Sequence, residues 1–265
     1  MTVTFLGTGT SHGVPCIDCM VNNYERCPKD ICRKSITNPK HRRTRCSILV
    51  ECGEKRILVD VSPDFREQVL RQRVLSIDAV LITHEHADHI GGIPDIRSYT
   101  KEPGPALPMY GSVESMNGVR GSFGYIFDPD TVVGGGIPRI ALNGIDGPFN
   151  LFGTLVTPIR VTHGGAQGCF GYRIGSIAYI PDMKTIAESE EAKLHGLDVL
   201  IVNCLRIERE HSTHLLLSQS MALARRVAPK KCVFVHMCHD IDYEADSSLL
   251  DAWMMFGFDG LQVSI

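Results

Sequence analysis

Six residues that follow a short apolar segment constrain this chain more than any other feature of its sequence. The segment Asp78–Thr83 has the composition of a buried β-strand, and residues 84–89 (His-Glu-His-Ala-Asp-His) follow it directly. Imidazole and carboxylate groups are ligands that suit zinc, iron and manganese. The four His and Asp side chains in these six positions cannot all reach one ion from a helix or a strand. A loop can divide them, so that His84 and His86 face one ion while Asp88 and His89 face a neighbouring ion.

Strands and helices are predicted to alternate along the rest of the chain. We expect strands over Thr2–Leu6, Cys46–Val50, Arg56–Asp60, Leu155–Val161, Phe170–Ile174, Ile177–Ile180, Asp198–Val202 and Cys232–Val235, and helices over Asp64–Arg73, Ser189–His195 and Leu217–Val227. Residues 103–148 are rich in Gly and Pro, so no long regular element is expected there. The alternation predicts α/β layers. Because we find neither a linker nor a fixed-period repeat, one domain over residues 1–265 is predicted.

Composition excludes several classes of protein. The 265 residues are 43% hydrophobic and 22% charged, which is typical of globular chains. No apolar run reaches the roughly 18–20 residues of a membrane span, and the first residues do not resemble a secretory signal, so we expect a cytoplasmic protein without membrane contact. A net charge of −3 does not favour nucleic acid as a partner. Ten cysteines in such a chain indicate thiols, metal ligands or buried side chains rather than disulfides.

Three more residues of ligand type each follow a predicted strand. His163 follows the strand Leu155–Val161, Asp182 follows Ile177–Ile180, and His236 follows Cys232–Val235. Sheets of α/β proteins place their active sites at the carboxyl ends of strands. We therefore expect these side chains to join residues 84–89 at one edge of the fold.

The pattern His84-x-His86-x-Asp88-His89, followed in order by His163, Asp182 and His236, resembles the signature of the metallo-β-lactamase superfamily. The resemblance implies a four-layer αβ/βα sandwich with metals at one edge. It also implies a first ion on His84, His86 and His163, a second ion on Asp88, His89 and His236, and Asp182 as the bridge between them. Two divalent ions about 3.5–4 Å apart can share a hydroxide that attacks phosphorus. The spacing alone leaves open a single ion, and it leaves open zinc, manganese or iron.

Four further segments narrow the resemblance. Residues 7–15, 42–47, 210–215 and 234–240 are similar to the phosphoribosyl 1,2-cyclic phosphate phosphodiesterase branch of that superfamily. This similarity covers nearly the whole chain and implies a metal-dependent hydrolase of a small phosphodiester, cyclic or open, with a homodimer as the assembly in keeping with the family. Asp88 and His214 are the residues expected to act in catalysis, with His214 holding a phosphate oxygen or protonating the leaving oxygen. His211 is the alternative to His214.

Members of the branch also resemble one another in a structural zinc site, built from N-terminal cysteines and a late histidine. His236 and His239 are three apart beyond a strand, so they tend to point to different sides, which leaves His239 for this second site. Cys19 and Cys32 match the outer cysteines of the branch pattern, but Val21 replaces the middle one. We expect Cys27 to substitute for it, with Cys16 in reserve. A Cys₃His set is a closed arrangement for zinc.

Other functions compete with this hypothesis. A ribonuclease Z-like nuclease uses similar ligands, but the roughly 30 residues between Asp182 and His214 hold no long Gly/Pro-rich arm. Thiolester hydrolysis of the glyoxalase kind is compatible with the same ligand spacing. A protein that only binds metal or a partner would be expected to have lost a ligand, and none is lost. β-Lactamase activity is disfavoured because no export signal is present. The basic segment Lys40–Arg45 could bind phosphate or simply face solvent.

Overall fold

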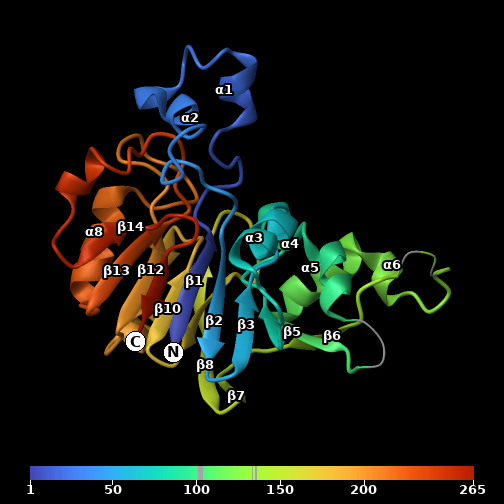
Figure 1. The fold of residues 1–265 in the computed structure, drawn as a ribbon. Helices are drawn as coiled ribbons and strands as arrows, with labels where there is room; N and C mark the ends of the chain where they lie inside the picture. Colours follow the sequence, from blue (N-terminus) through green and yellow to red (C-terminus); the bar gives the residue numbers. More distant parts are fainter. Residues whose placement is uncertain (101–103, 133, 135) are drawn as a thin grey trace.

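Two mixed β-sheets pack face to face in the computed structural model, which describes residues 1–100, 104–132, 134 and 136–265 (Figure 1). The first sheet contains, in spatial order, β15 (Gln262–Ser264), β1 (Thr2–Gly7), β2 (Ser47–Cys52), β3 (Lys55–Val59), β4 (Ala79–Leu81), β5 (Leu107–Gly111) and β6 (Ile140–Gly144). The second contains β11 (Thr185–Ile186), β8 (Thr154–Thr162), β9 (Phe170–Ile174), β10 (Ile177–Ile180), β12 (Val199–Asn203), β13 (Lys231–Val235) and β14 (Met254–Phe256), with β7 (Phe149–Leu151) paired to β8.

Helices cover the outer face of each sheet. The first sheet carries α3 (Phe65–Gln72), α4 (Ala87–Ile90), the 3₁₀ segment η2 (Ile93–Tyr99), α5 (Val113–Ser122) and α6 (Gly124–Phe127), whose apolar side chains share one buried cluster with that sheet. The second sheet carries α7 (Glu188–Glu191), η3 (Ala192–Leu194) and α8 (Leu217–Val227). A last short turn, η4 (Asp246–Leu249), precedes β14. The order helix, sheet, sheet, helix confirms the predicted four-layer sandwich.

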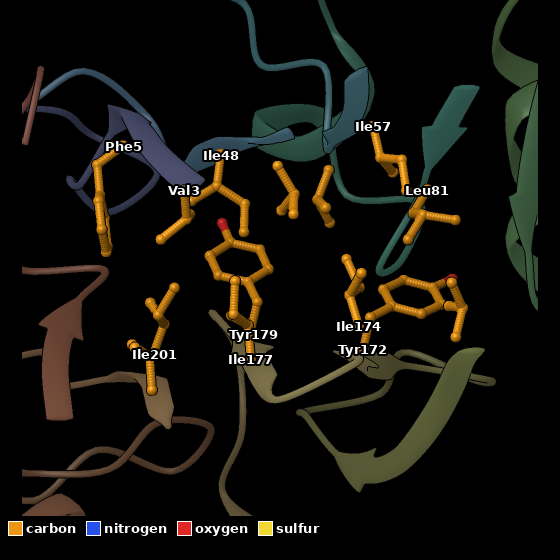
Figure 2. Close-up of a cluster of buried hydrophobic side chains, with 14 of the residues drawn as sticks. Val3, Phe5, Ile48, Ile57, Leu81, Tyr172, Ile174, Ile177, Tyr179 and Ile201 are labelled. Carbon is orange, nitrogen blue, oxygen red and sulfur yellow. The ribbon is translucent and has the colours of Figure 1, made fainter. Parts of the chain in front are cut away.

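The central core lies between the two sheets, and the period of the strands explains it. Alternate residues of a strand point to opposite faces, so Val3 and Phe5 point inward while Leu6 packs under the helices. Figure 2 shows Val3, Phe5, Ile48, Ile57 and Leu81 of the first sheet facing Tyr172, Ile174, Ile177, Tyr179 and Ile201 of the second. The Tyr172 hydroxyl donates a hydrogen bond to the carbonyl of Ile82 at 2.6 Å, which ties the sheets together near the site.

A segment that we name the cysteine loop, residues 16–40, projects from the sandwich (Figure 1). Its regular structure is limited to α1 (Ile17–Val21), η1 (Pro28–Asp30) and α2 (Ile31–Lys34). A small buried cluster of Val14, Ile31 and three cysteines is its own core. The loop is therefore held to the body mainly by polar contacts at its base, among them ion pairs of Lys34 with Asp242 and of Lys29 with Asp246.

The sequence-based prediction of elements is confirmed for most strands and helices and is wrong for the Gly/Pro-rich region. Within residues 103–148, where no long element was expected, α5 runs for ten residues. Its start is stabilised by Ser112, whose side chain accepts a hydrogen bond from the backbone of Ser115. Gly118 serves close packing, because an added Cβ would lie 2.5 Å from the Cβ of Glu85. Residues 103, 133 and 135 of this region lie outside the described part.

The direction of the strands places the predicted ligands at one edge of the sandwich and both ends of the described chain at the other. The parallel pairs β3/β4, β10/β12 and β12/β13 end at the same edge, and predicted ligands follow β4, β10 and β13. The opposite edge holds both ends of the described chain, because β1 pairs with β15 and the Met1 amine donates to the Ile265 carbonyl at 3.3 Å.

Candidate metal centre

The turn after β4 brings the first group of ligands together. His84 and His86 leave this turn with His84 Nε2 2.9 Å from His86 Nδ1. The His163 ring, which follows β8, lies 5.0 Å from the ring of His84 and 5.1 Å from that of His86, measured between centroids. One nitrogen of each of these three residues lies within 4.8 Å of the others. The structure thus places the three predicted ligands of a first ion side by side.

A second group forms beside the first. The short helix α4 starts after His86, so Asp88 and His89 both lie in its single turn. Asp88 Oδ2 lies 3.3 Å from His89 Nε2 and 3.8 Å from Nε2 of His236, which follows β13. His236 has a positive φ of 57°, which turns the chain sharply where the strand ends. These three residues match the set predicted for a second ion.

Asp182 lies between the two groups. Its Oδ2 is 2.8 Å from His89 Nε2, and its Oδ1 is 3.1 Å from His236 Nε2 and 3.8 Å from His163 Nε2. The carboxylate is buried and faces imidazoles from both sets. This is the position that a bridging ligand requires, since two oxygens can then serve two ions.

Protonation of these side chains suits metal binding. Burial lowers the pKa of His84 well below its ordinary value, and it also lowers the pKa of His163. Burial alone would raise the pKa of Asp182, but His236 and His89 hold it well below its usual range. Metals bind neutral imidazole and ionised carboxylate, so these groups need no proton removed. His89 differs: burial opposes its charge, yet Asp88, Asp60 and Asp182 raise its pKa well above the ordinary value, so an ion there displaces a proton.

Asp60 supports the centre and was missed by the sequence reasoning. It follows β3 with a positive φ of 63°, and its Oδ2 lies 2.7 Å from His89 Nδ1. Its Oδ1 accepts hydrogen bonds from the backbone and hydroxyl of Thr83 at 2.8 and 3.0 Å. The carboxylate therefore fixes the turn after β4 and orients the His89 ring toward the metals, as outer carboxylates do in metal sites. The available signal was a carboxylate at the end of an apolar strand.

His214 lies within the same cluster of imidazoles. Its Nδ1 is 3.2 Å from Asp182 Oδ1, and its ring stacks on that of His236 with centroids 4.6 Å apart. Burial and the neighbouring His236 lower the pKa of His214 to about 2. His211, the alternative, is more exposed and its ring lies 5.1 Å from that of His214. His214 therefore lies among the ligands, whereas His211 lies behind it and contacts the ring of His214.

A cleft of about 440 Å³ opens above these ligands. Its walls comprise Ser11, His86, Ala87, Asp88, His163, Gly164, Gly165, Asp182, Thr213, His214 and His236. A small molecule can therefore reach both predicted metal positions and His214 at once.

The cysteine loop forms a second cluster of ligand type around His239. His239 Nδ1 lies 3.2 Å from the sulfur of Cys16, 3.1 Å from that of Cys19 and 3.5 Å from that of Cys32. Cys16 and Cys19 are three residues apart at the start of α1, which turns both sulfurs to one side. Burial raises the pKa of the Cys19 thiol to about 12, a cost that a bound cation would offset. Three sulfurs and one imidazole are a donor set that fits zinc.

Cys27, predicted as a ligand, lies beside the cluster, and among the described residues its sulfur makes no hydrogen bond to His239. Its sulfur accepts a hydrogen bond from the backbone N–H of Cys32 at 3.2 Å, next to the cluster, whereas Cys16 contacts His239 directly. The structure thus groups Cys16, the reserve residue, with Cys19, Cys32 and His239. The reason is local: Cys27 precedes the η1 turn, which the spacing of cysteines could not place. Which three sulfurs bind an ion stays a prediction.

The two clusters are joined by a connecting segment, residues 236–241. Met237 pairs with Gly9, and its backbone N–H donates to the Thr8 carbonyl at 3.1 Å. Arg43, only 1% exposed, donates to the carbonyls of Cys238 and Ile241 at 2.7 and 2.8 Å. This arginine therefore fixes the chain that carries His236 and His239.

The other arginines of the basic segment also bind protein groups. Arg42 pairs with Glu67 at 2.9 Å, and Arg45 pairs with Asp64 at 2.9 Å. Arg45 also donates to the carbonyl of Ser11 at 3.0 Å. These contacts favour a structural role for Lys40–Arg45 over phosphate binding.

Comparison with known proteins identifies the class. The family described as Beta-lactamase superfamily domain matches residues 55–237, and the chain belongs to the metallo-β-lactamase superfamily. A crystal structure titled as a new diphosphatase from the PhnP family is similar over 100% of this chain and 97% of that one, with 34% identity and a TM-score of 0.88. The chain therefore resembles the PhnP branch within the superfamily. Zn²⁺-bound PqqB from Methylobacterium extorquens, 22% identical with a TM-score of 0.78 over both whole chains, shares the fold.

One curated relative has a different name. A protein of Porphyromonas gingivalis named octanoyltransferase is 33% identical over 268 residues, which is 100% of this chain but 52% of that protein. The chain spans about half the length of that relative, so the name does not assign an activity to the matched half. A ribonuclease Z of Bradyrhizobium is 38% identical over 66 residues, or 24% of this chain.

Among the described residues, no helix is long and apolar enough to cross a membrane.

Proposed function

We propose that this chain is a metal-dependent phosphodiesterase that acts on a small phosphodiester, cyclic or open. The observation that carries the proposal is the position of Asp182, within 4 Å of imidazoles from both ligand groups and open to the cleft. The PhnP-family diphosphatase, similar over the whole chain, supports a compound with a reactive phosphoryl group as the substrate class. Divalent ions in the two positions would lower the pKa of a water molecule and stabilise charge on phosphoryl oxygens.

The chain's own residues would orient the ligands and bind the phosphoryl group. Asp60 and Thr83 hold the turn after β4, so His84, His86 and His89 keep their orientation. His214 faces the cleft beside Asp182, where a neutral imidazole can donate its N–H to a phosphoryl oxygen. Because its pKa is lowered, holding that oxygen is better supported than giving up a proton.

A cysteine-held zinc is the second part of the proposal. The donor set of Cys16, Cys19, Cys32 and His239 supports a structural ion that fastens the cysteine loop to the connecting segment. A homodimer, a single domain over residues 1–265 and a cytoplasmic location remain predictions from the sequence.

The test is a hydrolysis assay on chain loaded separately with zinc and with manganese. The substrates are bis(4-nitrophenyl) phosphate, a 2′,3′-cyclic nucleotide, a structured RNA with a 3′ extension, and S-lactoylglutathione. We expect turnover of the first two that is lost on chelation and restored by metal. Cleavage of the RNA with salt-dependent affinity would favour the nuclease hypothesis instead. Turnover of the thiolester alone would favour the glyoxalase-like one.

A further inference from the structure

A side chamber adjoins the cleft above the metal ligands. It has a volume of about 280 Å³ and shares Ser11 and His214 with the cleft, so the two lie side by side. The cysteine loop forms one wall, through Cys16 and Asp18, and residues 205–211 form another. Neither the metal ligands around Asp182 nor the predicted role of His214 uses this space. It is slightly below the range of about 300–1,000 Å³ of sites for drug-sized ligands, so it suits a group the size of a sugar or a substituted ring.

Three residues of the chamber lining, Arg206, His214 and Asp240, have a buried side-chain atom without a hydrogen bond, and Arg206 is the one that carries a positive charge. In the described part of the chain its guanidinium has no ion pair or hydrogen bond, and its Nε is buried without a partner. The backbone of Arg206 is fixed, because its carbonyl accepts from Leu217 N–H at 3.0 Å. A buried guanidinium N–H that lacks an acceptor costs free energy, which an acceptor from a bound molecule would recover.

Other charges in the chamber do not neutralise Arg206. Arg209 lines the same space but pairs with Asp240 at 3.0 Å, and its side chain is 70% exposed. Asp18, the remaining carboxylate of the lining, is exposed at the outer rim on α1. Arg206 is therefore the cation available to an incoming group, and guanidinium binds carboxylate and phosphate in a two-pronged manner.

We propose that the chamber is a subsite for one ester arm of the substrate, and that Arg206 makes it select an arm with its own negative charge, a carboxylate or a phosphate. The proposal rests on the proposed phosphodiesterase function, because it assumes that the phosphodiester lies in the adjoining cleft. In the hydrolysis itself, the oxygen of water bonds to phosphorus and the ester P–O bond breaks. The departing oxygen keeps the electron pair and takes up a proton from water.

The test uses two symmetric diesters, bis(4-carboxyphenyl) phosphate and bis(4-carbamoylphenyl) phosphate. They have nearly the same shape and differ in charge, and symmetry places the same group in the chamber whichever arm departs. The quantity compared is the ratio of kcat/KM for the carboxylate to that for the amide. Comparing this ratio between variants cancels the intrinsic reactivity of the two esters.

We expect Arg206→Gln to lower the ratio by about tenfold or more, as loss of a hydrogen bond to a charged group does. Arg206→Lys should restore part of it, because the charge remains. Arg225→Gln, which removes a surface arginine of α8 paired with Asp251 and outside the chamber, is the matched control and should change the ratio less than threefold. Metal content and melting temperature of each variant verify that it is folded.

Two results would overturn the proposal in distinguishable ways. If wild-type chain hydrolyses both esters and the Arg206→Gln ratio stays within threefold, the subsite is wrong while the phosphodiesterase function stands. If metal-loaded wild-type chain hydrolyses neither these esters nor the diesters named above, the proposed function fails and the subsite falls with it. If Arg225→Gln lowers the ratio as much as Arg206→Gln does, the effect is a general one of positive charge, which would also contradict the assignment to Arg206.

Discussion

The metal centre and the cysteine cluster are both sets of ligand-type side chains, but the fold supports them in opposite ways. The centre takes its residues from the ends of β4, β8, β10 and β13, strands that are fixed by two sheets and three buried clusters. The cysteine cluster takes three of its four residues from a loop with one small core of its own. The centre can therefore keep its geometry without an ion, whereas the cysteine loop depends far more on what it binds.

Both regions meet in the connecting segment, which gives His236 to one and His239 to the other. Hydrogen bonds from Arg43 and the pairing of Met237 with Gly9 fix the backbone of this segment. Apart from the chamber wall formed by Cys16 and Asp18, a change in one cluster reaches the other through this short, well-anchored segment. We therefore expect changes in the two regions to separate cleanly into effects on chemistry and effects on stability.

The largest effect should come from Asp182→Ala. We expect hydrolysis of a small diester to fall by at least about a hundredfold, since removing the ligand between two cations leaves them to repel each other. The melting temperature and the ion held by the cysteines should be retained. Metal analysis and a rate assay measure both. Asp251→Ala, on a surface ion pair with Arg225, is the control. Activity within tenfold of the parent, with two ions still bound at the centre, would refute the bridging role.

Substitution of single cysteines tests whether the cysteine cluster holds an ion that stabilises the fold. Cys16→Ser and Cys32→Ser should each lower bound zinc by about one ion per chain and lower the melting temperature by about 5 °C or more, because metal binding contributes to folding. Most turnover should remain. Cys27→Ser is the matched control and should keep the ion. The reverse pattern, with zinc lost from Cys27→Ser and kept in Cys16→Ser, would restore Cys19, Cys27 and Cys32 as the ligands.

An intermediate effect is expected from His214→Ala. Loss of one hydrogen-bonding imidazole beside the centre should cut turnover by about tenfold to a hundredfold. Metal content and melting temperature should change little. His211→Ala, further from Asp182, should lower turnover less than threefold. A larger loss in His211→Ala than in His214→Ala would exchange the roles of the two histidines.

The smallest effect is a loss of stability at low pH, through Asp242, which pairs with Lys34 of the cysteine loop. Burial would raise the pKa of Asp242, but hydrogen bonds from Lys34 and the backbone of Ala245 hold it below 3.8. A carboxyl with a lowered pKa in the folded state stabilises the fold above its unfolded pKa, and this contribution is lost as pH falls below about 4. Wild-type chain should therefore lose more stability between pH 5 and pH 3 than Asp242→Asn does. Thermal melts across that range measure the difference, and equal slopes would contradict it.

The same contrast explains what the sequence could and could not predict. Residues such as His163, Asp182 and His236 were found because strand ends of an α/β fold converge on one edge whatever the loops do. Asp60 escaped because its role depends on which strand lies beside β4, and pairing is not visible in a single strand's pattern. The choice between Cys16 and Cys27 escaped because it depends on irregular turns, where no period relates sequence spacing to direction. Helix α5 was missed because Gly118 signals close packing here, rather than a loop.

The meeting of the first and last strands has a consequence for how this fold can be extended. Met1 and Ile265 are adjacent at the edge opposite the ligands, on strands paired in register. A protein joined to either end would thus emerge away from the cleft, and a short linker between the two ends could close the chain into a ring. Circular permutants with new ends in exposed loops, away from residues 84–89 and 236–241, should keep the centre assembled. Additions at either end of the described chain therefore need not disturb the metal ligands.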